Sequence, residues 1–279
     1  MCFQLGGRMK GNLAELFPAS PRVIYSKTPL VQVICELRFP LLLSIEGQPP
    51  VAFQEQVRGH FPLLEKKPAT AFPAEIPSEI VQMIRPHVEG GPSYVFLTAD
   101  RASTVTLTPG SLALSTKRYT RWEDFRDQLR VPLEALNQIY RPSFFSRIGL
   151  RYQDAIDRAA LGLKSRSWSE LLRRELLGEL ALPQFEAHVE QVANRTLRVG
   201  IPGGSGSVML RHGLGKLPGR DEICYMIDID IFTEQRTEVA DAESTLNHFN
   251  AVAGHAFRWC VLAPLRDELG PNELAAAAV

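Results

Sequence analysis

The first regular pattern along the chain is an alternation of apolar and polar positions. From Leu30 to Phe39 the odd-numbered positions are apolar, and Glu36 and Arg38 lie among the intervening ones. A period of two predicts a strand with one buried face. Helical spacing of apolar residues then predicts a short helix after Pro49 and a long one from Trp122 to Tyr140. Short strands are predicted between these helices around Ile80 to Ile84, Tyr94 to Leu97, Thr104 to Thr108 and Leu112 to Ser115.

The second half of the chain shows the same order of patterns. A strand around Leu150 precedes a predicted helix from Trp168 to Leu180, and a final helix runs from about Asp241 to Cys260. Between these helices, strands are predicted at Glu186 to Val192, Leu197 to Ile201, Val208 to His212 and Ile223 to Phe232. The segment Leu37-Arg38-Phe39 also matches Leu150-Arg151-Tyr152 in character.

These patterns predict an α+β protein with an internal duplication. Each half would have the order β-α-ββββ-α, with a curved antiparallel sheet packed on a long helix. We expect a loose leader at residues 1–22, a first half at 23–142 and a second half at 143–279. This order resembles the TATA-binding-protein-like and helix-grip folds, which host DNA binders, lipid carriers and enzymes, so the resemblance implies a fold and no function.

The strand faces indicate where chemistry could lie. In the last strand, Ile227 and Ile229 share one face with their apolar neighbours and are expected to face the helices, which leaves Asp228 and Asp230 on the other face. The same rule puts further charged residues on the open side of the sheet, namely Glu36, Arg38, Arg147, Arg151, Glu186, His188 and Glu190. The open face is therefore expected to be polar and of mixed sign.

Each of these groups allows a functional and a plain interpretation. Asp228 and Asp230 could hold Mg²⁺ or Mn²⁺ for phosphoryl chemistry, or could form a solvated or ion-paired face. Arg38 and Arg151 could clamp a carboxylate or phosphate, or could pair with acidic neighbours such as Glu36. His188 between two glutamates could supply a general acid or base, although such a residue is more often an exposed cross-strand partner.

Composition narrows the function classes. Lys+Arg and Asp+Glu are equal at 31 each and 45% of the residues are apolar, which suits a globular protein and argues against a basic nucleic-acid sleeve. The four cysteines form no C-x-x-C pair, which argues against a disulfide framework or a structural zinc site. Neither a membrane span nor a signal pattern is found, so we expect a cytoplasmic protein without a membrane partner.

A set of short motifs carries a second resemblance. In order, these are Tyr25-Ser26-Lys27-Thr28-Pro29-Leu30-Val31, Glu36-Leu37-Arg38-Phe39, Phe61-Pro62, Arg147-Ile148-Gly149-Leu150-Arg151-Tyr152 and Asp228-Ile229-Asp230. From about Tyr25 to Leu269 the chain resembles a sporadically distributed bacterial family of uncharacterised function. That distribution implies an accessory role, in defence, toxin-antitoxin or biosynthetic systems. Gln153-Asp154 stands where the resemblance leads us to expect an asparagine.

The leading hypothesis from the sequence is a non-enzymatic binding module without a cofactor. It would hold a protein or peptide partner on the open sheet face, or in a groove between the halves, because mixed charges steer and specify partners. One alternative is a metal-dependent enzyme acting on a nucleotide or phosphoester, with Asp228 and Asp230 as ligands. Another is a carrier of an apolar small molecule. The sequence does not indicate an oligomeric state.

Overall fold

A computed structural model describes residues 16–67, 92–189 and 194–273 of the chain. The chain forms two compact units. Of the described residues, the first unit holds 30–67, 92–151 and 234–246, and the second holds 16–29, 152–189, 194–233 and 247–273. Both units combine antiparallel strands with helices, so the chain is a mixed α+β protein, as the sequence predicted.

The first unit is built on antiparallel strands in the order β3-β4-β5-β6-β2, followed by the start of β7. Ser146, which precedes β7, donates a backbone hydrogen bond of 2.8 Å to the carbonyl of Arg38 at the end of β2. The strands are β2 (Leu30–Arg38), β3 (Leu63–Lys67), β4 (Ser93–Leu97), β5 (Ser103–Thr108), β6 (Ser111–Thr116) and β7 (Arg147–Ile156). The helices are α1 (Leu43–Gly47), α2 (Val51–Val57) and α4 (Trp122–Ile139).

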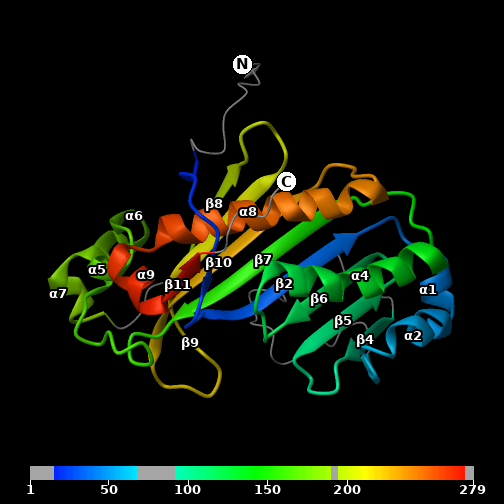
Figure 1. The fold of residues 1–279 in the computed structure, drawn as a ribbon, viewed down its shortest axis with the longest axis horizontal. Coiled ribbons are helices and arrows are strands. Elements are labelled where there is room, and N and C mark those ends of the chain that lie inside the picture. Colours follow the sequence, from blue (N-terminus) through cyan, green and yellow to red (C-terminus); the bar gives the residue numbers. More distant parts are fainter. Residues whose placement is uncertain (1–15, 68–91, 190–193, 274–279) are drawn as a thin grey trace. The chain divides into compact units, whose positions relative to one another are not determined.

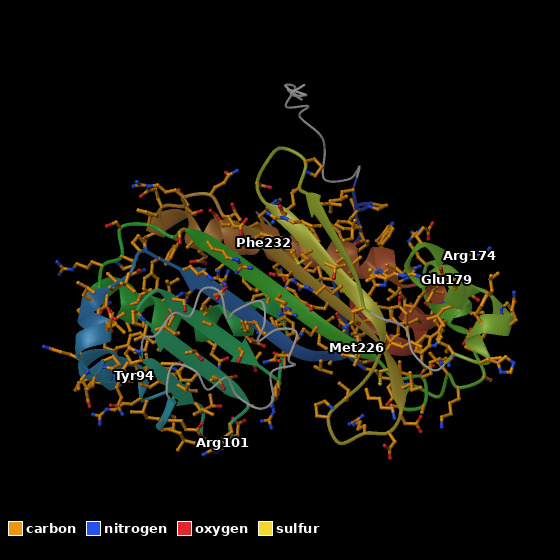
Figure 2. The ribbon with its side chains drawn as sticks, turned by 180° about the vertical axis from the view of Figure 1, so that it is seen from behind. Tyr94, Arg101, Arg174, Glu179, Met226 and Phe232 are labelled. Carbon is orange, nitrogen blue, oxygen red and sulfur yellow. The ribbon has the colours of Figure 1, made fainter. Side chains whose placement is uncertain are left out.

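The core of the first unit lies between one face of these strands and helices α2 and α4 (Figure 1). Val33, Cys35 and Leu37 of β2 are fully buried there, so the alternation in the sequence identified the buried face correctly. Figure 2 views the strands from the side opposite the helices. Strands β4, β5 and β6 and the long helix α4 match the predicted elements. The predicted strand Ile80 to Ile84 lies outside the described residues, and strand β3 was not predicted.

The second unit continues from the end of β7 in the strand order β7-β10-β9-β8. Its other strands are β1 (Val23–Tyr25), β8 (Arg195–Gly200), β9 (Ser207–Lys216), β10 (Ile223–Thr233) and β11 (Pro271–Glu273). Its helices are α5 (Trp168–Leu171), α6 (Arg174–Leu177), η3 (Gly178–Ala181), α7 (Pro183–Glu186) and α9 (Ala263–Leu269). Helix α8 (Ala242–Cys260), preceded by the short η4 (Val239–Asp241), begins in the first unit and ends in the second.

The core of the second unit confirms the predicted face of the last strand. Ile227, Ile229 and Ile231 of β10 are at most 1% exposed. Tyr152 of β7 donates a hydrogen bond of 2.9 Å to Asn250 Oδ1 on α8, which ties that helix to the strands of this unit. The hydrophobic burial of these strands against α8 stabilises the unit.

The predicted helix from Trp168 to Leu180 is wrong as a single element, because it is broken at Leu172. Leu172 forms an isolated antiparallel bridge with Val261, and the backbone N–H of Arg173 donates to the carbonyl of Cys260 at 3.1 Å. These backbone partners replace the next turn of helix. The chain then resumes as α6, which ends at Gly178 with φ of 54°.

The predicted strand from Glu186 to Val192 is wrong over its described residues, Glu186 to Val189. Residues Pro183–Glu186 form helix α7, with the proline in the first turn, and His188 lies in an exposed turn after it. Glu190 lies outside the described residues. Three strands, rather than four, therefore stand between helices in the described part of the second half.

Residues 16–22, at the described end of the expected leader, are held against α8. The ring of Phe17, which is 5% exposed, lies 6.0 Å from the ring of Trp259. The hydroxyl of Ser20 lies 3.0 Å from His255 Nδ1. Among the described residues, none of the helices has the length and apolar character needed to cross a membrane.

Candidate functional site

Three of the predicted site residues meet on the open face of the first unit. Arg147 Nη1 lies 2.6 Å from Glu36 Oε2, and Arg38 Nη2 lies 3.1 Å from the same oxygen. The three side chains are between 14% and 20% exposed. We call Glu36, Arg38 and Arg147 the ionic cluster. Because its members are only partly hydrated, their charges act more strongly than those of exposed surface pairs.

Local sequence explains how this cluster can form. Glu36 and Arg38 are two residues apart on β2 and so project from the same face. Gly149 lies under the Arg147 side chain, since a Cβ atom built at Gly149 would be 2.3 Å from Arg147 Nη1. The missing side chain at position 149 therefore lets the guanidinium lie flat along β7 and reach Glu36.

Short side chains extend the open face beside the cluster. On β6, Ala113 is directly opposite Glu36 and Ser111 is directly opposite Arg38. On β5, Thr106 is opposite Ala113 and Thr108 is opposite Ser111. These residues are partly exposed and alternate with buried leucine and valine positions. The result is a strip of small side chains, three of which carry hydroxyl groups, beside the ionic cluster.

Arg151 lies on the same face of β7 as Arg147 by the alternation of the strand, and it is partly exposed. It belongs to the first unit with the other members of the predicted set. The sequence therefore placed Glu36, Arg38, Arg147 and Arg151 on one face, and the fold brings three of them into direct contact.

Glu186 and His188 do not join this face. Glu186 belongs to the second unit, where its Oε1 lies 2.6 Å from Arg158 Nη1. The same carboxylate accepts hydrogen bonds of 3.1 and 3.2 Å from the backbone N–H of Trp168, the first residue of α5. Glu186 therefore caps a helix, because the first N–H groups of a helix have no partner within it. His188 lies in an exposed turn after α7 and does not belong to the ionic cluster.

Asp228 and Asp230 lie on the face of β10 opposite the buried isoleucines, as predicted. Asp228 Oδ2 lies 3.4 Å from Arg211 Nη1, and Arg211 is its direct cross-strand neighbour on β9. Asp230 is 6% exposed. Within residues 16–67, 92–189 and 194–273, no cluster of three or more His, Cys, Asp and Glu side chains is placed to hold a metal ion. Asp228 of the proposed metal pair thus faces a guanidinium in this fold.

Sequence reasoning missed a buried carboxyl group in the second unit. Asp154 of β7 is 2% exposed, and burial together with the charge of Asp228 raises the pKa of its carboxyl well above the usual value. The pKa of the Cys260 thiol is also raised, mainly by burial and further by the charge of Asp154. The alternation of β7 could have revealed this residue, because Asp154 has the same parity as buried Leu150 and Tyr152.

The cysteines among the described residues are buried, and none of them forms a disulfide. These are Cys35, Cys224 and Cys260. Cys35 lies under the ionic cluster on the core side of β2, and burial raises the pKa of its thiol. A buried thiol with a raised pKa is a poor nucleophile, so these cysteines contribute packing.

Comparison of the chain with protein-family models and with curated proteins finds no match.

Proposed function

We propose that the protein is a non-enzymatic binding module. The open face of the first unit holds a segment of a partner protein, and that segment carries a carboxylate that binds Arg38. The observation that supports this most is the sharing of one carboxylate, Glu36, between two guanidinium groups at 2.6 and 3.1 Å.

The charge of the cluster favours an acidic partner. Arg38 makes the longer of the two contacts with Glu36, and Arg147 makes the shorter. A guanidinium has five N–H donors arranged to bind carboxylates in pairs of hydrogen bonds. A partner carboxylate beside Arg38 would therefore add an acceptor where positive charge exceeds negative, which is the charge complementarity that specifies a partner.

The strip next to the cluster suits an extended segment of chain. Ser111, Ala113, Thr106 and Thr108 have short side chains, so another backbone can approach the sheet closely. The hydroxyl groups of Thr106, Thr108 and Ser111 can donate to or accept from the polar groups of that backbone. Specificity would then come from the acidic side chain at the cluster.

We also infer that the two halves arose by duplication. In each half the opening strand lies beside the last strand of the following meander, β2 beside β6 and β7 beside β10. Arg38 corresponds to Arg151 in the matched segments Leu37-Arg38-Phe39 and Leu150-Arg151-Tyr152, although Arg38 ends β2 and Arg151 is the fifth residue of β7. The described part of the second half has three strands after its helices, one fewer than the four of the first half. We assign partner binding to the open face of the first unit, which has the larger set of strands.

The test compares captures by tagged wild-type protein and an Arg38→Glu variant in lysate of the native cell, quantified by mass spectrometry. Arg38→Glu leaves the Arg147–Glu36 pair in place and reverses the charge that we assign to the partner. The matched control is Arg58→Glu, at the end of α2, where the side chain is 63% exposed and pairs with Glu55.

We expect wild type and Arg58→Glu to capture the same partner protein in similar amounts. Arg38→Glu should capture about tenfold less of it or lower still, and a tenfold loss of affinity corresponds to about 1.4 kcal/mol. Replacing the acidic residues of its bound segment with amides should reproduce that loss. Equal capture by all three proteins, with the variants melting as wild type does, would exclude this face as the binding site.

A further inference from the structure

We propose that a cavity in the first unit is a second binding site, which takes a small, neutral, hydroxyl-rich molecule such as a monosaccharide. The cavity has a volume of about 260 Å³ and lies between the β4–β5 turn, the end of β6 and the first turns of α4. The lining residues include Asp100, Ser103, Thr116, Arg118, Tyr119, Asp124 and Phe125. The volume is below the roughly 300 Å³ at which sites for drug-sized ligands begin.

The floor of the cavity is polar where the strand pattern calls for apolar residues. Ser103 and Thr116 stand on the core-facing sides of β5 and β6, in line with buried Val105 and Leu114. They are 5% and 3% exposed, and their hydroxyl oxygens are 2.9 Å apart. Apolar side chains at these two positions would extend the packed core. The two buried hydroxyl groups instead provide hydrogen-bonding groups inside a cavity.

Asp100 is fixed as an ionised acceptor on one side. Its Oδ1 accepts hydrogen bonds from the backbone N–H of Ala102 at 3.0 Å and from Thr98 Oγ1 at 2.7 Å. Its Oδ2 accepts from Arg118 Nη1 at 2.8 Å. The backbone hydrogen bond from Ala102, with that from Thr98 and the charge of Arg118, lowers the pKa of the Asp100 carboxyl.

Asp124, in the first turn of α4, is fixed in the same way. Its Oδ2 accepts from Thr120 Oγ1 at 2.5 Å, and its Oδ1 accepts from Arg121 Nε at 2.8 Å. The hydrogen bonds from Thr120 and Arg121 lower the pKa of the Asp124 carboxyl. Each oxygen of a carboxylate can accept about two hydrogen bonds, so both oxygens of Asp124 can accept another from a ligand.

The charges around the cavity select the class of ligand. Each carboxylate is already paired with a guanidinium, Asp100 with Arg118 and Asp124 with Arg121. The two guanidinium groups and the two carboxylates balance in charge, so neither an added cation nor an added anion gains a net attraction. Ligand hydroxyl groups can donate to the remaining lone pairs without adding a charge.

An aromatic wall completes the cavity. The rings of Tyr119 and Phe125 both line it, with centroids 6.0 Å apart. A sugar ring presents C–H groups on its faces, and covering them with an aromatic surface removes apolar area from water. Hydrogen-bond acceptors and an aromatic surface are the two kinds of contact that a monosaccharide needs. This site uses none of the residues of the ionic cluster.

The experiment maps backbone amide shifts of the full chain by NMR during titration with D-glucose, D-galactose and D-mannose. Choline and inorganic phosphate serve as charged probes. We expect at least one sugar to shift amides of residues 98–103 and 118–125 with a Kd on the order of 1 mM, as suits a small ligand. Asp124→Asn should weaken that binding about fivefold or more, because it removes a charged acceptor.

The matched control is Asp127→Asn on the same helix, where the side chain is 57% exposed and does not line the cavity. It should bind the sugar as wild type does. Tyr119→Ala provides a second loss-of-binding variant that leaves both carboxylates unchanged. The proposal fails if no sugar shifts these amides, if choline or phosphate shifts them more strongly, or if Asp124→Asn and Tyr119→Ala both bind like wild type.

Discussion

Arg147 reaches Glu36 across 111 residues of sequence and donates a hydrogen bond of 2.6 Å to its carboxylate. The two residues are the first of β7 and the seventh of β2, and the contact depends on the bare backbone of Gly149 between them in space. We therefore expect a methyl group added at Gly149 to disturb the contact between Arg147 and Glu36.

Gly149→Ala should displace the Arg147 side chain, because the new Cβ atom would lie 2.3 Å from Nη1. The end of an arginine is flexible, so we expect the free energy of unfolding to fall by only about 1 kcal/mol. Urea denaturation measures this change. Gly59→Ala is the control, since a Cβ atom there has nothing within 4 Å.

Combining Gly149→Ala with Arg147→Ala should cost less than the sum of the single changes, because both remove the same contact. Fully additive losses would contradict the role that we give to Gly149.

Asp154 predicts how stability depends on pH. Its pKa is raised in the folded state by burial and by Asp228, so the folded protein holds this proton at pH values where the unfolded chain has released it. The stabilising contribution is complete below the unfolded pKa of about 3.9. It then falls by up to about 1.4 kcal/mol per pH unit until the folded pKa is reached.

Asp154→Asn should remove this loss and raise the urea midpoint at pH 7, because the amide stays neutral in both states. The substitution also supplies the residue type that the family resemblance led us to expect at this point. Exposed Asp221→Asn is the control and should leave the slope with pH unchanged. A lower midpoint for Asp154→Asn at pH 7 would show that the carboxylate is needed in its charged form.

Tyr225 supports the core of the second unit through its hydroxyl group. It donates to the carbonyl of Leu176 at 3.0 Å and lies 2.8 Å from His212 Nδ1. Burial lowers the pKa of His212, so the ring is held neutral and its Nδ1–H can donate to the tyrosine oxygen.

Tyr225→Phe should lower the free energy of unfolding by about 1–3 kcal/mol, because it leaves two buried polar groups without this partner. Chemical denaturation gives the value. Tyr140→Phe, at a half-buried tyrosine that ends α4, should change it by less than about 0.5 kcal/mol. Similar losses for both variants would show that the hydroxyl of Tyr225 has no special role.

Glu186 and His188 should respond differently to substitution. Glu186→Ala removes the acceptor of the Trp168 N–H at the start of α5 and the contact with Arg158, so we expect a loss of about 1–2 kcal/mol. His188→Ala, two residues later in an exposed turn, should leave stability within about 0.5 kcal/mol of wild type. Thermal and urea unfolding would both show the difference. A strand in which these residues share a face would give losses of similar size.

Local sequence predicted those elements whose pattern is long and supported by tertiary packing. Strand β2 and helix α4 show clear periods over 9 and 18 residues, and both were confirmed. The alternation from Glu186 to Val192 was misleading, because Pro183 favours a helix start and Glu186 finds its partners at Trp168 and Arg158. The helix expected from Trp168 was divided because Leu172 pairs with Val261, a partner that no local pattern reveals.

The sequence by itself determined the α+β class and the buried faces of β2 and β10. It also determined that Glu36, Arg38, Arg147 and Arg151 share the open face, because this follows from the period of β2 and β7, but it wrongly placed Glu186 and His188 there. Only the tertiary structure decided which charges meet. Arg147 pairs with Glu36, Asp228 faces Arg211, and Asp154 is buried near Cys260, because sheet register and helix packing bring distant segments together. A periodic pattern records which side of an element is apolar, and it carries no information on which distant side chain will be its neighbour.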